Sequence, residues 1–263
     1  MKAKFSMHAI AAAALLAFGG AASAVEFTDP RGDDKGPGNY TYPTDAVYKP
    51  GSFDIVKFTA TATNVDATFQ VEVNSTLEDP WGMGTGFSVQ MIFIFIKTGP
   101  GGHTETPPGL NLVFPSGDEW NKVVVLSPQR KARVVAEAEA KTGKLAKDIV
   151  VPNLTRGRGR VITGTVPLSE LVGPGKAANV EAWGYQVVMQ SNEGFPAAGD
   201  FLTRKVNEYE GQHRWGGGHD GDCDPHTMDV LDGPNAKQAE MLAYECGPDG
   251  KSVKRATLKM IAK

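Results

Sequence analysis

The segment VQMIFIFI, from Val89 to Ile96, is apolar at every position except Gln90. Successive side chains of a β-strand point to opposite faces of the sheet, so such a run predicts a central strand that is covered on both sides. The run stops at Lys97 and is too short to cross a bilayer as a helix. It therefore predicts the centre of a β-sheet protein.

Shorter segments that alternate between apolar and polar residues lie on both sides of this run. Alternation with a period of two is typical of strands that bury one face. Glycine (31 residues) and proline (17 residues) are spread between the segments, as in sandwiches and barrels. We therefore predict an all-β fold, a two-sheet antiparallel β-sandwich with short helical turns only. The expected strands are residues 53–60, 69–74, 89–96, 122–126, 161–166 and 185–189.

Two segments carry helical signals. Residues 133–147, RVVAEAEAKTGKLAK, are rich in helix formers. However, residues 136–141 alternate strictly, and the following Thr-Gly-Lys is a turn signal. We therefore predict a β-hairpin for this segment. Residues 167–171, PLSEL, predict a single helical turn that is opened by proline.

The N-terminus has the pattern of a secretory signal peptide. Lys2 and Lys4 precede an apolar run over residues 9–18, and Ala22-Ser23-Ala24 matches an A-x-A cleavage site. The pattern predicts cleavage after residue 24 and export to the periplasm or the medium. The remaining 239 residues, 25–263, contain no internal repeat or linker and fit one all-β domain. No later segment is long and apolar enough to cross a bilayer.

Charge argues against nucleic acid as a partner. Without Lys2 and Lys4 the chain has 25 basic and 30 acidic residues, a net charge of −5. Binding to phosphates requires a basic face instead. The stretch Arg156-Gly157-Arg158-Gly159-Arg160 is a local exception, typical of a solvated loop.

Two cysteines, Cys223 and Cys246, lie in the exported part. An oxidising compartment favours a disulfide between them, and a pair of buried free thiols is the alternative. The sequence has no C-x-x-C-H motif, which excludes covalently attached c-type haem.

Acidic residues gather in two loops. Asp29, Asp33 and Asp34 lie in a turn rich in glycine and proline, which can direct several carboxylate oxygens toward one calcium ion. The second loop contains three alternating aspartates and resembles the start of an EF-hand, but it has proline at the sixth position and leucine at the twelfth. A calcium loop of another type remains open there. The aspartates of the second loop are Asp220, Asp222 and Asp224.

Histidines beside the second loop raise the possibility of zinc, although their spacing matches no standard zinc site. The residues concerned are His213, His219, Cys223 and His226.

Several aromatic residues lie near loops or strand ends, where an exposed ring can stack on a sugar. A tryptophan in a sandwich more often belongs to the core, and the sequence does not separate the two roles. The candidates for sugar stacking are Tyr40, Tyr42, Trp81, Trp183 and Trp215, with Trp120 as a further aromatic near a loop.

Four stretches together resemble one known family. They are DPRGDDKGPGNYTYPT (29–44), PGSFDI (50–55), DPWG followed by GFSVQ (79–90), and WGGG followed by DP and MDVL (215–231). They are similar, in the same order, to the C-terminal domain of bacterial glucodextranases, a DOMON-like module. The resemblance implies a β-sandwich related to family 9 carbohydrate-binding modules, with calcium and sugar binding.

We therefore predict a secreted, non-catalytic carbohydrate-binding module that is stabilised by calcium and binds an α-glucan or a cell-surface glycan. No G-x-S-x-G, H-E-x-x-H or P-loop motif occurs. One alternative is a DOMON-like electron carrier with haem b, for which Met91, Met189 and His103 are the candidate ligands. Another is a cell-surface structural or adhesion protein without a small ligand.

Overall fold

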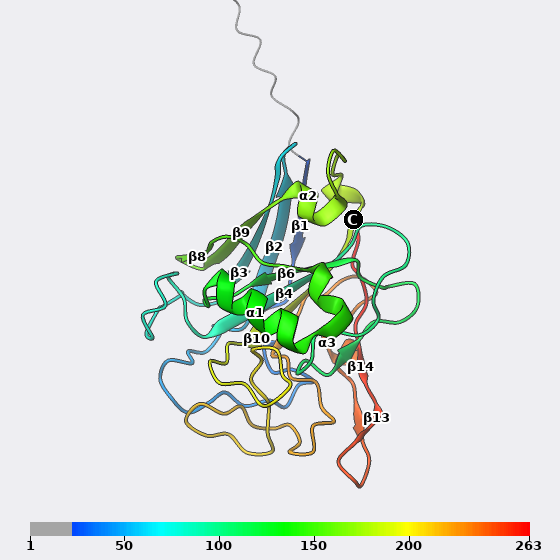
Figure 1. Ribbon diagram of the computed structural model, residues 1–263. Coiled ribbons are helices and arrows are strands. Elements are labelled where there is room, and N and C mark those ends of the chain that lie inside the picture. Colours follow the sequence, from blue (N-terminus) through cyan, green and yellow to red (C-terminus); the bar gives the residue numbers. More distant parts are fainter. Residues whose placement is uncertain (1–22) are drawn as a thin grey trace, which may run out of the picture.

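The computed structural model describes residues 23–263 and contains two five-stranded sheets that pack face to face (Figure 1). The first sheet is antiparallel throughout, and the second contains one parallel pair, β6 with β7. The first sheet has the order β1 (Ser23–Thr28), β2 (Ile55–Ala62), β3 (Asp66–Val73), β9 (Val161–Pro167) and β8 (Thr155–Arg158). The second has the order β11 (Asp229–Val230), β10 (Gly184–Ser191), β4 (Gln90–Lys97), β6 (Lys122–Leu126) and β7 (Ile149–Val150). The prediction of an all-β sandwich is confirmed.

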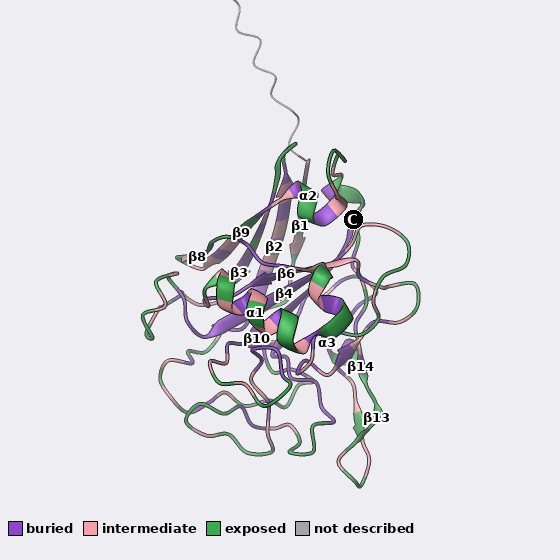
Figure 2. Ribbon diagram, viewed as in Figure 1, coloured by how far each residue is buried: buried purple, intermediate pink, exposed green. Residues whose placement is uncertain are grey.

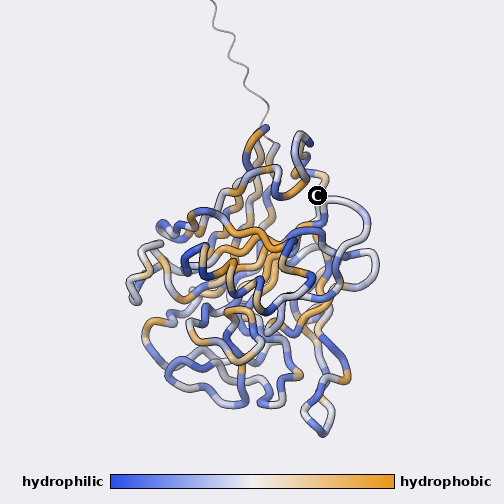
Figure 3. Tube along the Cα trace, in the orientation of Figure 1, coloured by the Kyte–Doolittle hydropathy of each residue, from blue (hydrophilic) through white to orange (hydrophobic). Residues whose placement is uncertain are grey.

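The second sheet is buried on both faces, as the apolar run from Val89 to Ile96 predicted. Ile92 of β4 pairs with Leu126 of β6, and the Leu126 side chain packs toward β9 in the first sheet. The alternate residues of β4 point the other way. Phe93 packs on Phe201 and Phe95 packs on Phe114, with ring centroids 6.0 and 5.1 Å apart. The hydropathy of the chain shows this apolar centre directly (Figure 3).

The first sheet buries one face only. In β3, Phe69 and Val71 are fully buried, whereas Thr68, Gln70 and Glu72 between and beside them face outward. The strands of this sheet therefore alternate between buried and exposed residues (Figure 2). This sheet presents a polar, solvent-facing surface.

The hairpin predicted for residues 133–147 is wrong. The segment forms the helix α1 (Lys131–Lys141) and the 3-10 turn η1 (Gly143–Asp148). Val134 and Ala138 are buried at a spacing of one helical turn, and Glu137 pairs with Lys141 at 2.8 Å. Helix propensity and this apolar pair outweigh the strict alternation. The predicted turn after Pro167 is confirmed as α2 (Leu168–Val172).

The remaining elements are short. They are η2 (Val180–Ala182), α3 (Gln238–Met241), the paired strands β5 (Leu112–Val113) and β14 (Ala256–Thr257), and the hairpin of β12 (Glu245–Cys246) and β13 (Ser252–Lys254).

Long loops gather at one end of the sandwich. Residues 29–52 and residues 192–228 lie together below the sheets in Figure 1, and Thr41 bridges to Gly216 between them. These loops contain most of the residues predicted to bind a ligand. Residues 1–22, most of the expected signal peptide (1–24), lie outside the described residues, and Ser23 and Ala24 of the expected cleavage site begin β1. Residues 23–263 contain no helix of sufficient length and hydropathy to cross a membrane.

Candidate functional site

A cluster of carboxylates forms where the start of the chain meets β11. Asp29 directly follows β1, Asp33 lies in the next turn, and Asp229 lies in β11. One oxygen from each lies within 4.8 Å of the others. Asp54, which directly precedes β2, is a neighbouring carboxylate outside this group of three, and its charge raises the pKa of both Asp29 and Asp33. The fold thus gathers four acidic side chains that are up to 200 residues apart in the sequence.

Three of these carboxylates are half satisfied, and Asp33 accepts no hydrogen bond from another residue of the described chain. The backbone N–H groups of Asp232, Gly32 and Ile55 donate to Asp29 Oδ1, Asp54 Oδ2 and Asp229 Oδ2, at 2.6, 2.8 and 2.5 Å. The second oxygen of each is buried and has no hydrogen-bond partner among residues 23–263. These free oxygens are Asp29 Oδ2, Asp33 Oδ1, Asp54 Oδ1 and Asp229 Oδ1. Buried polar atoms are rarely left unpaired, so the arrangement fits a cation held by Asp29, Asp33 and Asp229, with Asp54 beside them.

The electrostatics of the cluster point the same way. Burial, together with the neighbouring carboxylates, raises the pKa of Asp29 to about 8 and the pKa of Asp33 to about 6. The pKa values of Asp229 and Asp54 are also raised, first by burial. Like charges in a dry site oppose ionisation. A divalent cation with oxygen ligands would relieve this repulsion, and calcium takes six to eight such ligands.

Gln238 of α3 fixes the turn against β11. Its Nε2 donates to the carbonyl oxygen of Gly36 at 3.1 Å, and its Oε1 accepts the N–H of Val230 at 2.8 Å. Asp34 is not part of the cluster, because its carboxylate accepts the hydroxyl of Tyr42. The sequence therefore identified Asp29 and Asp33 in the gathered group and missed Asp54 and Asp229.

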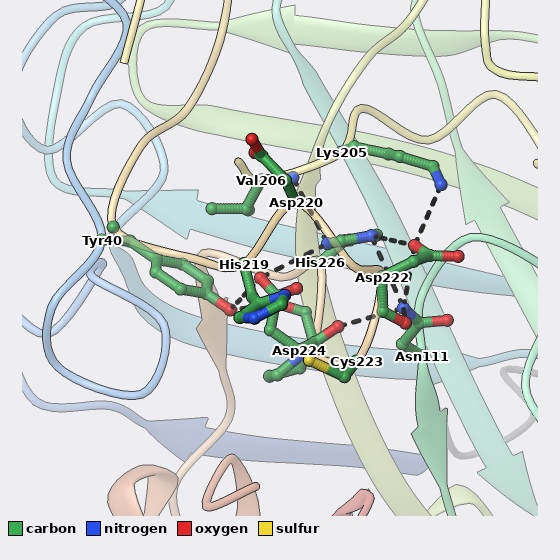
Figure 4. A network of polar contacts seen from close by, with 12 residues as sticks. Tyr40, Asn111, Lys205, Val206, His219, Asp220, Asp222, Cys223, Asp224 and His226 are labelled. Carbon is green, nitrogen blue, oxygen red and sulfur yellow. Dashed lines mark hydrogen bonds and ion pairs between the residues drawn. The ribbon is translucent and has the colours of Figure 1, made fainter. Parts of the chain in front are cut away.

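The second acidic loop does not gather its aspartates (Figure 4). Asp220 accepts the N–H of Glu208 at 2.9 Å, and Asp224 accepts the hydroxyl of Tyr40 at 3.1 Å. Asp222 has two basic partners, His226 and Lys205. The three carboxylates do not converge on one point, although Asp224 Oδ1 is buried and has no partner in the described chain.

Asp222 instead pairs with two basic residues. It lies 2.7 Å from His226 Nε2 and 3.0 Å from Lys205 Nζ. The hydrogen bond from His226 is the main reason that the pKa of the Asp222 carboxyl lies well below its usual range. The N–H of Val206 donates to His226 Nδ1 at 3.3 Å, so the ring proton lies on Nε2. The network joins residues 205–206 to the acidic loop.

Cys223 and Cys246 form the predicted disulfide, with Cα atoms 5.5 Å apart. His219 lies beside the two sulfurs, but neither sulfur is a free thiolate. His226 is occupied as described above, and His213 lies 3.9 Å from Asp45. The residues considered for zinc are therefore not brought together as ligands.

The three haem candidates are also separated. Met91 pairs with Gln190, and Met189 pairs with Ile92, on adjacent strands. Because residues paired across a rung point to the same side, the two methionines face opposite sides of the sheet. His103 lies 2.7 Å from Asp148 and contacts the ring of Trp120. The two thioethers cannot bind one haem.

Burial removes most aromatic candidates from a stacking role. Tyr42 is half-buried, and among the candidates for sugar stacking only Trp81 is exposed, with an exposed fraction of 38%. The prediction of a stacking role therefore has to be corrected for the rings that fill the core, since a buried ring cannot contact a sugar. These buried rings are Tyr40, Trp120, Trp183 and Trp215.

Trp81 is held on an ordered loop. Asp79 accepts the N–H groups of Met83 and Gly84, both at 2.7 Å, and also binds the hydroxyl of Ser88. These bonds lower the Asp79 pKa, although partial burial acts against them. Ser88 Oγ in turn accepts the N–H of Trp81 at 3.3 Å. The loop thus presents the indole in a fixed position.

Polar groups flank the Trp81 ring. Tyr48 and His213 each lie edge-on to it, with centroids 6.3 Å away. Arg204 lies over the Tyr48 ring at 5.9 Å. The buried Tyr48 hydroxyl has no hydrogen-bond partner among residues 23–263, and burial raises its pKa to about 12. The exposed indole beside the exposed His213 has the composition of a sugar-binding surface.

An aromatic cluster connects Trp81 with the acidic turn. Tyr48 stacks on Phe53 at 6.3 Å, and Phe53 contacts Tyr42 at 5.7 Å and Trp215 at 4.9 Å. Tyr42 then donates its hydroxyl to Asp34, next to Asp33. A continuous chain of side-chain contacts therefore runs from the Trp81 ring to Asp34, which is next to Asp33 in the sequence.

The protein is thus a two-sheet β-sandwich with long loops gathered at one end. The family model of the C-terminal, SLH-like binding module of glucodextranase matches residues 24–260. The chain therefore belongs to this family, which is a family of binding modules and not of catalytic domains. A comparison with curated proteins gave no match.

Proposed function

We propose that this protein is a secreted, non-catalytic carbohydrate-binding module that binds an α-glucan or another polysaccharide through Trp81. The observation that carries the proposal is the exposed indole on the loop ordered by Asp79, beside the exposed ring of His213. The membership in a family of binding modules supports it. A sugar ring would stack on Trp81 and the exposed His213 would bind its hydroxyl groups, while the buried Tyr48 supports the indole from its edge.

We further propose that calcium stabilises the module at Asp29, Asp33, Asp54 and Asp229. Their four buried oxygens without partners in the described chain fit a hard cation with oxygen ligands. Calcium would supply the positive charge that lets these carboxylates stay ionised. The ion would thereby tie β1, the acidic turn, β2 and β11 together.

Affinity electrophoresis in soluble α-glucans tests the binding proposal. We expect retarded migration of the wild type and a loss of at least about tenfold in affinity for Trp81→Ala, which corresponds to roughly 1.4 kcal/mol. Phe195→Ala is the matched control, because Phe195 is an exposed aromatic residue with an exposed fraction of 94%. Unretarded wild type over a broad panel, or equal losses in both variants, would overturn the proposal.

A further inference from the structure

The outward face of the first sheet presents an ordered array of polar side chains. Across one rung, Thr59 pairs with Gln70, Gln70 with Thr163, and Thr163 with Arg156. On a neighbouring rung, the hydroxyls of Thr68 and Thr165 are 2.8 Å apart. Side chains on a rung point to the same side of the sheet. The face therefore carries amide, hydroxyl and guanidinium groups in fixed positions.

A groove of 420 Å³ runs over this face at the β8 side of the sheet. Leu154 forms part of its lining with an exposed fraction of 51%, which adds an apolar patch to the polar array. Such a combination suits a sugar, since pyranose rings present both hydroxyls and C–H groups. The remaining lining residues used below are Gln70, Arg156, Arg158, Thr163 and Thr165.

Two arginines give the groove its charge. Arg156 and Arg158 are exposed, and neither guanidinium has an ion pair or hydrogen bond with any residue in the described part of the chain. Arg160 behaves differently, since it binds the Val73 carbonyl at 2.8 Å and Asn74 at 3.0 Å. Residues two apart in a strand project to the same side about 6.7 Å apart. Arg156 and Arg158 thus form a pair of unneutralised cations on a molecule with net negative charge.

The strand that carries these arginines is anchored from its other edge. The N–H of Gly157 donates to the carbonyl of Thr85 at 2.8 Å. A Cβ on Gly86 would lie 2.4 Å from the Gly157 oxygen, so the two segments approach as closely as glycine allows. Because β8 is fixed on both sides, binding would order only the arginine side chains. Such preorganisation lowers the entropic cost of binding.

We propose that this groove binds an acidic polysaccharide whose sugars carry carboxylates. Arg156 and Arg158 bind uronate carboxylates through two parallel hydrogen bonds each, the geometry that guanidinium groups favour. Gln70, Thr163 and Thr165 bind the sugar hydroxyls. The inference rests on the proposed carbohydrate binding but assigns a second surface, separate from Trp81.

Polygalacturonate, its fully methyl-esterified form and a neutral α-glucan are the probes, applied to the exported protein by affinity electrophoresis and calorimetry. We expect binding to polygalacturonate that weakens with salt, and much weaker binding to the ester. The double variant Arg156→Gln/Arg158→Gln should lose at least about tenfold in affinity for polygalacturonate. Its affinity for the neutral glucan should not change.

The matched control is Lys176→Gln/Lys254→Gln, which removes the same charge from exposed positions elsewhere. Equal losses in the control, equal binding of the ester, or tighter binding of duplex DNA than of polygalacturonate would each overturn the inference. Arg156→Lys/Arg158→Lys keeps the charge and should restore only part of the affinity. Trp81→Ala should leave polygalacturonate binding intact. The two carbohydrate proposals therefore fail independently.

Discussion

Asp229 lies in β11. One oxygen of its carboxylate accepts the N–H of Ile55, and the other has no hydrogen-bond partner in the described chain. Asp229→Asn keeps an acceptor for Ile55 and removes the charge. Wild type should gain roughly 5–10 °C in melting temperature with excess calcium. The variant should lose this gain, and in chelator it should melt no lower than wild type because the carboxylate repulsion is relieved.

Asp34→Asn is the control for this prediction, since Asp34 is buried in the same turn but binds Tyr42 instead of the cluster. Its calcium-dependent gain in melting temperature should match that of wild type. A full calcium response in Asp229→Asn would contradict the proposed ligand set. Identical wild-type melts with chelator and with calcium would contradict the metal site itself.

The raised pKa values make a second prediction at the same residues. The folded protein without metal binds protons at Asp29 and Asp33 up to pH values near 8 and 6, well above the ordinary value of 3.8. The folded state then holds more protons than the unfolded state, so stability falls as pH rises. In chelator, the melting temperature should decrease from pH 5 to pH 8.

Calcium should reverse this trend, because its ligands must be deprotonated and its affinity therefore rises with pH. The difference in melting temperature between calcium and chelator should widen between pH 5 and pH 8. Differential scanning calorimetry at four pH values would measure both curves. A chelated protein that gains stability toward pH 8 would contradict the electrostatic description of the cluster.

Residue patterns in the sequence located half of this cluster. Asp29 and Asp33 are visible because they crowd a short loop with glycine and proline. Asp54 and Asp229 are single acidic residues inside apolar runs, FDIV and MDVL. The signal in the sequence was an aspartate at the end of an apolar strand segment, because a strand of this kind is expected to be buried and ionisable residues are rarely buried without a partner. Which of them meet depends on the pairing of distant strands, and local spacing contains no information about that.

At the scale of elements, α1 shows how two local signals can compete. The stretch AEAEAK alternates as a strand would, and the same residues have high helix propensity. The tertiary contact decides, because Val134 and Ala138 are one turn apart and both reach the core. The apolar strands were easier to predict, because their periodicity and the final burial agree.

The helix makes a prediction of its own. Ala136 is exposed in the interior of α1, so Ala136→Gly should lower the free energy of unfolding by about 1 kcal/mol through helix propensity alone. Ala177→Gly is the control, because Ala177 is exposed outside any helix or strand. Urea denaturation monitored by circular dichroism measures both. An equal effect in the two variants would argue against a helix at residues 131–141.

At the scale of the whole molecule, the carboxylate cluster and the Trp81 surface are linked through Tyr42, Phe53 and Tyr48. Removal of calcium should therefore weaken α-glucan binding several-fold, although no proposed ligand contacts the sugar. Trp81→Ala should make the residual binding insensitive to chelator. Calorimetric titrations with and without chelator provide the measurement, and unchanged wild-type affinity after proven calcium loss would exclude the coupling.

The two-layer architecture was predictable because each sheet has its own pattern. The strands of the second sheet are continuous apolar segments, and those of the first sheet alternate between apolar and polar residues. The apolar faces of both sheets must be covered, and a sandwich follows from this. The aromatic roles were not predictable from the sequence. Trp81 and Trp215 both stand beside glycines, and only the packing of loops from distant parts of the chain separates an exposed ring from a core ring.

The close contact between Gly86 and Gly157 has a consequence for self-association. A strand at the border of a sheet can recruit a strand from another molecule, which is a common start of aggregation. In β8 the N–H of Gly157 is already engaged by Thr85, so this border is shielded. Several modules bound along one polysaccharide can then lie next to each other without pairing through their β8 strands. Any side chain at position 86 would push the Thr85 segment away from β8 and leave this edge of the sheet open to strands of other molecules.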